Sequence, residues 1–128
     1  MIHPADMVQD APKPLEPQVP MTHRMPVIVQ AGYTDLFCIL HRALDQAQNG
    51  KGHERHAGGR TFTDQPILTI TRNRGFGFPF GQVEKKIDEA DGMIQRGDLK
   101  AAERELLGAI NYLAAAVIRI HEIEGAAT

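Results

Sequence analysis

Apolar residues recur every three or four positions through the C-terminal half of the chain, which is the spacing of α-helices with one apolar face. The pattern predicts a helix from about Phe80 to Arg96, with a face formed by Val83, Ile87, Ala90 and Ile94. It predicts a second helix from about Leu99 to Ile123, with a face formed by Leu99, Ala102, Leu106, Ala109, Ile110, Leu113, Val117 and Ile120. We expect these two faces to pack against each other.

Arg96, Gly97 and Asp98 separate the two helices. Glycine tolerates the left-handed conformation in which many helices end, and aspartate is favoured at the start of the next helix. A connection this short joins antiparallel neighbours. The segment therefore predicts a helical hairpin.

The second helix of this hairpin is apolar over a wider arc than one partner helix can cover. The apolar residues outside its predicted face are Leu107, Ala114, Ala115 and Ile118. Leaving several such side chains in water would forfeit a few kcal/mol, at about 25 cal/mol per Å². We therefore expect a further contact, either with an upstream helix or with another copy of the chain in a homo-oligomer.

Two shorter helices are predicted upstream. The first can be capped by Thr34 or Asp35 and stopped by Asn49 and Gly50. Its apolar positions are Leu36, Phe37, Leu40, Ala43, Leu44 and Ala47. Residues 64–74 contain β-branched residues typical of strands, yet Asp64 followed by Pro66 is typical of a helix start, and we predict a short helix there.

Residues 1–26 hold six of the eight prolines, which remove backbone donors and restrict their neighbours, so we predict an extended tail. Residues 27–128 then form one helical domain. The predicted fold is all-α: a hairpin of two long antiparallel helices with one or two shorter helices and the N-terminal tail.

Composition restricts the environment and the class of function. The net charge of −2 lacks the basic excess of a general nucleic-acid binder. Cys38 is the only cysteine, which excludes an intrachain disulfide, and its apolar neighbours predict that it packs in the core. The chain shows no export signal, and its longest mostly apolar stretch, Leu113 to Ile118, is far below the ~20 residues of a membrane span. We expect a cytoplasmic protein without membrane contact.

The segment from Arg72 to Gly81 combines arginines, glycines and phenylalanines directly before the hairpin. Free N–H groups at a helix start attract anions, and arginine presents forked donors that suit phosphate. We predict a pocket for a phosphate-bearing nucleotide, with cations on the phosphate, a phenylalanine stacked on the base and glycines allowing close approach. The predicted ligand residues here are Arg72, Arg74, Gly75, Phe76, Gly77, Phe78, Lys85 and Lys86. The alternative is that the phenylalanines fill the core and the arginines are solvated.

Residues 50–61 form a polar, glycine-rich loop, in which His53, Arg55 and His56 are predicted to close over the same ligand. Solvent exposure is the alternative for all three. Zinc needs three or four ligands, and this cluster offers too few, so we expect no metal or other cofactor.

Carboxylates on the first hairpin helix, at Glu84, Asp88, Glu89 and Asp91, could face Glu103 and Glu105 on the second. All-helical nucleotide pyrophosphatases hold Mg²⁺ between such sets. The nearby lysines and arginine instead favour surface ion pairs.

The stretch from Phe78 to Val117 resembles the SaV-like domain of small phage and prophage helical-hairpin proteins. The matching positions are Phe78, Gly81, Lys85, Leu107, Tyr112 and Leu113, and the departures are Gln82, Lys86 and residues 89–91. That domain accompanies a phage nucleotide kinase. The general plan also resembles the phage sponge proteins, which are helical-hairpin oligomers that capture cyclic nucleotide signals between subunits.

These observations lead us to expect a nucleotide-binding oligomer without catalysis, such as a phage sponge for a nucleotide immune signal. One alternative is a nucleotide kinase or Mg²⁺-dependent nucleotide pyrophosphatase that uses Glu84 or Asp88. Another is a structural or partner-binding phage protein, with the proline-rich tail as its docking strand.

Overall fold

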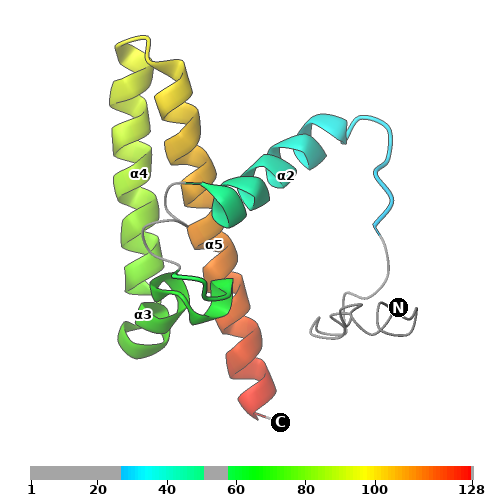
Figure 1. Ribbon diagram of the computed structural model, residues 1–128, viewed down its shortest axis with the longest axis vertical. Coiled ribbons are helices and arrows are strands. Elements are labelled where there is room, and N and C mark those ends of the chain that lie inside the picture. The colour runs from blue at the N-terminus through cyan, green and yellow to red at the C-terminus, as the bar shows by residue number, and fades with distance from the viewer. Residues whose placement is uncertain (1–26, 51–57, 128) are drawn as a thin grey trace, which may run out of the picture. The chain divides into compact units, whose positions relative to one another are not determined.

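The computed structural model describes residues 27–50 and 58–127, and every regular element within these ranges is a helix (Figure 1). The elements are α2 (Thr34–Asn49), a 3₁₀ turn η3 (Phe62–Asp64), α3 (Pro66–Arg74), α4 (Gly77–Gln95) and α5 (Leu99–Ala127). The predicted all-α fold is confirmed, and so is the short helix predicted within residues 64–74.

Helices α4 and α5 run antiparallel, side by side, as the predicted hairpin (Figure 1). Gly97 ends α4 with a φ of 83°, in the left-handed region that glycine tolerates. Its N–H donates to the Ile94 carbonyl at 3.0 Å, and the Asp98 N–H donates to the Met93 carbonyl at 2.8 Å. These two bonds make a Schellman motif, which satisfies the last carbonyls of α4 and turns the chain into α5.

Helix α4 begins at Gly77, three residues before the predicted start at Phe80. Pro79, which has no backbone donor, is the third residue of α4. In the first turn no intrahelical donor is required, so Pro79 fits there. Gly75, with a φ of 93°, is the joint between α3 and α4.

Helix α2 begins without the predicted side-chain cap. Tyr33 occupies the N-cap position, no side chain bonds the free N–H groups there, and Thr34 is already helical. The predicted stop at Gly50 is confirmed, since its N–H donates to the Gln46 carbonyl at 2.8 Å. A Cβ at Gly50 would lie 2.5 Å from that carbonyl oxygen, so this close turn requires glycine.

The C-terminal half of α2 is bonded to α5. Asn111 Nδ2 donates to the Ala43 carbonyl at 3.0 Å, and Gln46 Nε2 donates to the Arg104 carbonyl at 3.1 Å. Arg42 pairs with Glu103 beside them. All of these contacts come from Arg42 or from residues after it. Cys38, predicted to be a core residue, is instead exposed, because the N-terminal half of α2 extends past α5 (Figure 1).

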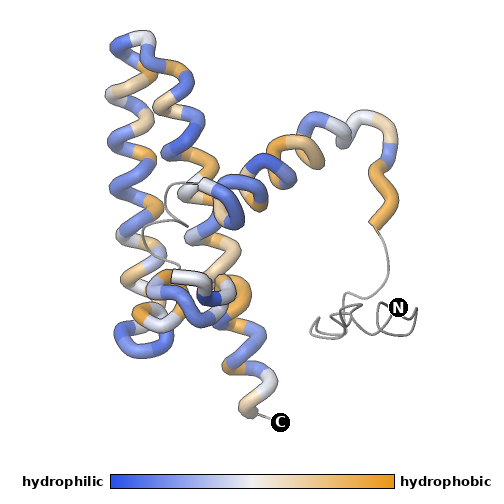
Figure 2. Tube along the Cα trace, viewed as in Figure 1, coloured by the Kyte–Doolittle hydropathy of each residue, from blue (hydrophilic) through white to orange (hydrophobic). Residues whose placement is uncertain are grey.

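The core is built mostly from small side chains. Six of the eight buried hydrophobic residues in the described ranges are alanines, and the others are Leu68 and Leu107. Large apolar side chains on α2, α4 and α5 are mostly half-exposed, and apolar positions recur along these helices in Figure 2. This distribution is unusual for an isolated domain, in which large aliphatic residues are the usual core.

Residue contacts divide the chain into two units, residues 1–31 and 32–128. In the first unit the structure describes only residues 27–31, among which Val27 and Ile28 are exposed. The tail predicted over residues 1–26 lies outside the described residues.

Candidate functional site

Side-chain contacts identify the sides on which α4 and α5 meet. Lys86 of α4 places its Nζ 3.3 Å from Glu105 Oε1 and 5.8 Å from the centre of the Tyr112 ring. Phe78 packs edge-on against Tyr112, with ring centres 5.9 Å apart. Burial in this contact raises the pKa of the Tyr112 hydroxyl.

Alanines fill the rest of this contact. Ala102, Ala109 and Ala116 are buried and lie three or four residues from Glu105 or Tyr112, so they share the same side of α5. Ala90 of α4 is buried four residues after Lys86. The two helices therefore meet through small side chains, which allow close approach.

Large apolar residues form the neighbouring row on each helix. They are spaced seven residues apart and comprise Phe80, Ile87 and Ile94 on α4 and Leu99, Leu106, Leu113 and Ile120 on α5. Their exposed fractions lie between 41% and 62%. We call these seven residues the heptad face.

The heptad face corrects the packing predicted from sequence. Ile87, Ile94 and the large residues of α5 were expected to point at the opposite hairpin helix, and they do not. The physical reason is that rows of alanine and rows of leucine lie side by side on α5. Periodicity marks both rows as apolar but does not show which one a partner helix covers.

The heptad-face residues of α4 and those of α5 lie on the same side of the hairpin. Ile87, Leu106 and Leu113 each follow a contact residue by one position, which is a rotation of about 100° about the helix axis. Because α4 and α5 run antiparallel, equal rotations turn toward the same side. Counting outward from the Gly97 turn, Ile94 and Leu99 are level, and so are Ile87 and Leu106, and Phe80 and Leu113.

A second apolar feature is a groove of about 570 Å³ between α2 and α5. Its walls include Leu40, Leu44 and Ala47 from α2 and Ile110 and Ile118 from α5, with Phe62 of η3 contributing as well. The polar residues that also line it are Gln48, Arg60, Thr61, Gln65 and Asn111. The sequence did not predict this groove, because it depends on the angle at which α2 meets α5.

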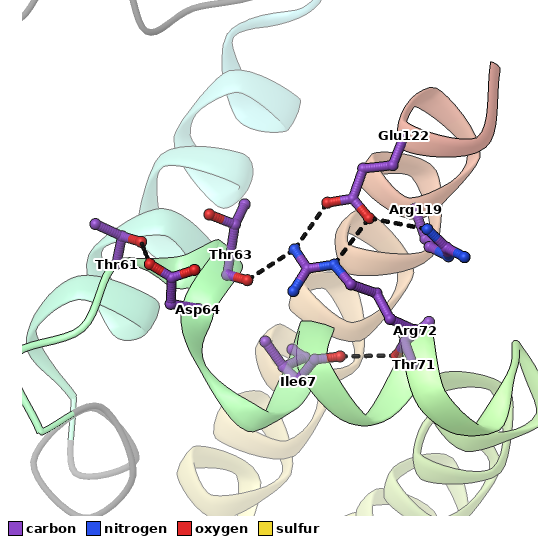
Figure 3. A network of polar contacts seen from close by, with 8 residues as sticks. All are labelled: Thr61, Thr63, Asp64, Ile67, Thr71, Arg72, Arg119 and Glu122. Carbon is purple, nitrogen blue, oxygen red and sulfur yellow. Dashed lines mark hydrogen bonds and ion pairs between the residues drawn. The ribbon is translucent and has the colours of Figure 1, made fainter. Parts of the chain in front are cut away.

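Arg72, the first predicted phosphate ligand, is bound within the protein (Figure 3). Its Nε and Nη2 donate to the two carboxylate oxygens of Glu122 at 3.0 and 2.8 Å. Nη2 also donates to the Thr63 carbonyl at 2.8 Å, and Arg119 approaches Glu122 at 3.3 Å from the other side. Arg72 thus joins η3 and α3 to the end of α5.

The Arg72 pair makes stability depend on pH. Hydrogen bonds from Arg72 hold the pKa of Glu122 below its ordinary value of 4.5, and Arg119 adds to this effect. A depressed folded-state pKa stabilises the fold at a pH above the unfolded value, and this contribution is lost as the pH falls through the folded-state pKa. We expect Glu122→Gln to lower the free energy of unfolding at pH 7 by about 1 kcal/mol, since the pair is bidentate but partly exposed.

Urea unfolding of wild type and Glu122→Gln at pH 7 and at pH 3 would measure this effect. The difference between the two proteins should shrink at pH 3. A Glu124→Gln variant changes the charge equally on the exposed side of the same turn and is the matched control. Equal losses in both variants would contradict the role given to Glu122.

The structure does not bring Arg72 and Arg74 together on one anion. Residues two apart on a helix point to different sides, and Arg74 is exposed while Arg72 is bound to Glu122. Lys86 is engaged between the hairpin helices, and Lys85 lies on the surface with its Nζ 4.0 Å from Glu89. These four cations therefore do not meet at one point in the described structure, and binding of an anion by this segment stays a prediction.

The aromatic residues of the same segment are also engaged. Phe76 stacks on Phe80 at a ring-centre distance of 5.9 Å, and Phe78 contacts Tyr112 as described. Gly75 and Gly77 are exposed and serve the junction between α3 and α4. These phenylalanines pack within the protein, which was the alternative to base stacking.

The other two candidate sites were the histidine loop and the Mg²⁺ carboxylates. His53, Arg55 and His56 lie outside the described residues. Glu103 and Glu105, proposed as one half of a Mg²⁺ site, each pair with a cation from another helix. Within residues 27–50 and 58–127, no group of three or more His, Cys, Asp or Glu residues could hold a metal ion.

Helix α5 is long and apolar enough to cross a membrane by length and composition. Core helices of bundles meet the same criterion. Three of its glutamates, at positions 103, 105 and 122, pair with Arg42, Lys86 and Arg72 from the other helices. Most of its exposed large side chains gather on one side instead of surrounding the helix.

Comparison of the chain with protein-family models, with curated proteins and with solved structures gave no match. The resemblance to the SaV-like domain and to sponge proteins stays an expectation. The heptad face, which presents seven exposed large apolar side chains, is the basis of the function proposed below.

Proposed function

We propose that this protein acts by binding, without catalysis, as a self-associating helical protein whose hairpins pack heptad face to heptad face. The observation that carries the proposal is the division of apolar residues within the hairpin. Alanines hold α4 to α5, and the seven large side chains of the heptad face lie in the row beside that contact, where no other part of the described chain covers them fully.

A second copy of the hairpin fits this face better than a lone helix does. The face has two parallel rows with level layers, so two such faces related by a two-fold axis give a four-helix bundle with layers of four large residues. Four-helix bundles use this type of packing, and a two-fold contact requires a surface that complements itself. The side chains of the face are about half-exposed in each copy. At about 25 cal/mol per Å², covering the four side chains of one layer contributes several kcal/mol to the free energy of association.

Charged residues border the face on α4. Glu84 and Asp91 lie three or four residues from Phe80, Ile87 or Ile94 and therefore next to the heptad row, and Asp88 lies further around the helix. Charged side chains are depleted from the cores of protein interfaces and common at their rims.

Nucleotide binding, as a sponge or otherwise, stays a prediction from the sequence. Arg74 is the arginine of the predicted segment that is still exposed, next to the start of α4. A self-associated form would be compatible with a ligand bound between subunits, but the case for self-association does not depend on one.

Sedimentation velocity over a wide range of protein concentration tests the proposal. We expect a mass that is a multiple of the 14.1 kDa chain, with dissociation only at the lowest concentrations. A single-chain mass at all concentrations would contradict it. The proposal would also be contradicted if the protein sedimented as a single chain and partitioned into lipid vesicles, because lipid would then cover the apolar side of α5.

A further inference from the structure

We propose a second self-association surface, in which α2 pairs antiparallel with α2 of another copy about a two-fold axis at Leu40. In this arrangement Leu36 and Phe37 of each copy enter the groove between α2 and α5 of the other. The inference extends the proposed self-association to a different face and does not require the heptad face to be used.

One continuous apolar row runs along α2. Its members are spaced alternately four and three residues apart and comprise Tyr33, Phe37, Leu40, Leu44 and Ala47. This is the spacing by which helices pack side by side. Leu36 and Ala43 lie next to the row, seven residues apart.

The two halves of this row have different surroundings. In the C-terminal half, Leu44 and Ala47 line the groove with α5. In the N-terminal half, Tyr33, Leu36 and Phe37 are 58%, 53% and 51% exposed. One helix thus carries an open groove at one end of its row and projecting apolar side chains at the other.

This arrangement complements itself. In an antiparallel pair centred on Leu40, Leu36 is level with Leu44 of the other copy, and Phe37 is level with its Ala43. The projecting side chains then lie over the groove in both directions, which is the reciprocity that a two-fold contact requires. Leu36 and Phe37 cannot fill the groove of their own chain, because they lie further along the same rigid helix.

Charge on α2 is compatible with the pairing. Asp35 and Arg42 are more than 90° from the row around the helix axis, Asp45 is about 80° from its nearest member, Phe37, and Arg42 is already paired with Glu103. Cys38 lies on the same side as these charges. No like charges are therefore forced together when the two rows meet.

The two surfaces together have a symmetry consequence. Each is a two-fold contact, and two different two-fold contacts on one chain close into a tetramer with dihedral symmetry when their axes intersect at right angles. Loss of either surface should then leave a dimer held by the other one.

Cysteine cross-linking tests the pairing. In a Cys38→Ser background, we expect Leu40→Cys to form a disulfide-linked dimer under mild oxidation, because the two copies of residue 40 meet at the axis. Leu36→Cys in the same background is the matched control, since it is equally exposed on the same side of the helix. Two copies of residue 36 would be offset by about 12 Å along the helices, beyond the reach of a disulfide. A mixture of Leu36→Cys and Leu44→Cys chains should cross-link as a heterodimer.

The outcomes separate the two surfaces. Equal cross-linking at positions 36 and 40, or none at 40, overturns the pairing of α2, whatever the mass of the wild type. Repeating the Leu40→Cys experiment with Leu106→Glu and Leu113→Glu, which disrupt the heptad face, should leave the cross-link intact. A cross-link at position 40 in a wild-type dimer whose mass these two glutamates do not change would support the α2 surface and contradict the proposed function.

Discussion

Replacing Leu106 and Leu113 with glutamate should remove the heptad-face contact and reduce the mass of the oligomer by at least half. Each copy then carries two carboxylates in the centre of the proposed bundle, so a two-fold pair of hairpins would bury four without partners. Burying an unpaired charge costs several kcal/mol, which exceeds what the remaining apolar layers supply. Light scattering coupled to size-exclusion chromatography would measure the change at a fixed protein concentration.

A control variant separates position from charge. Asn73→Glu with Ala126→Glu adds the same two negative charges at exposed positions outside the heptad face. It should keep the wild-type mass. Circular dichroism should show equal helix content in all three proteins, because Leu106 and Leu113 are already 41% and 47% exposed in the single chain. An unchanged mass for the Leu106 and Leu113 variant would remove the heptad face as the basis of function.

The hairpin could be predicted from sequence because its signals are local. The Gly97 turn and the spacing of apolar residues each act within a few residues of the chain, and the structure confirms both. The start of α4 was predicted three residues late, and the first turn that was missed contains Gly77 and Pro79, two residue types that are unfavourable in helix interiors.

The packing faces could be predicted only in part: Ala90, Ala102 and Ala109 of the predicted faces are buried, whereas the large residues beside them are exposed. Sequence periodicity shows that a side of a helix is apolar but not which apolar side is covered within the chain. On α5, a row of alanines and a row of large residues are adjacent, and α4 contacts the alanines. The sequence nevertheless shows the seven-residue spacing of Leu99, Leu106, Leu113 and Ile120. This spacing is the signal that could have identified the heptad face.

The ion-pair partner of Arg72 could not be predicted, because it is distant along the chain. Arg72 bonds Glu122, fifty residues later in the chain, and the Thr63 carbonyl. Arg72 beside a helix start resembles a phosphate ligand as long as its carboxylate partner is unknown. Exposure of Cys38 has a similar origin, because the apolar neighbours that suggested a core position belong to the half of α2 that extends past α5.

Because small side chains form the contact between α4 and α5, larger side chains placed there should destabilise the hairpin. We expect Ala109→Leu to destabilise the protein by about 1–3 kcal/mol, because three extra carbons must enter the close contact between α4 and α5. Ala116→Leu should behave in the same way. Urea unfolding at one fixed protein concentration would measure both losses, since association itself contributes to apparent stability.

The matched control for volume is Ala126→Leu, which adds the same atoms at an exposed position of the same helix and should change the free energy of unfolding by less than about 0.5 kcal/mol. The direction of the change in unfolding free energy for Ala109→Leu distinguishes two ways of packing α4 on α5. If α4 packed instead on the large residues of α5, Ala109 would face solvent, and leucine there would be neutral or slightly stabilising through its helix propensity. A loss at Ala109 and Ala116, together with a loss of mass in the Leu106 and Leu113 variant, would show that the alanine row holds the chain together and the heptad face holds the copies together.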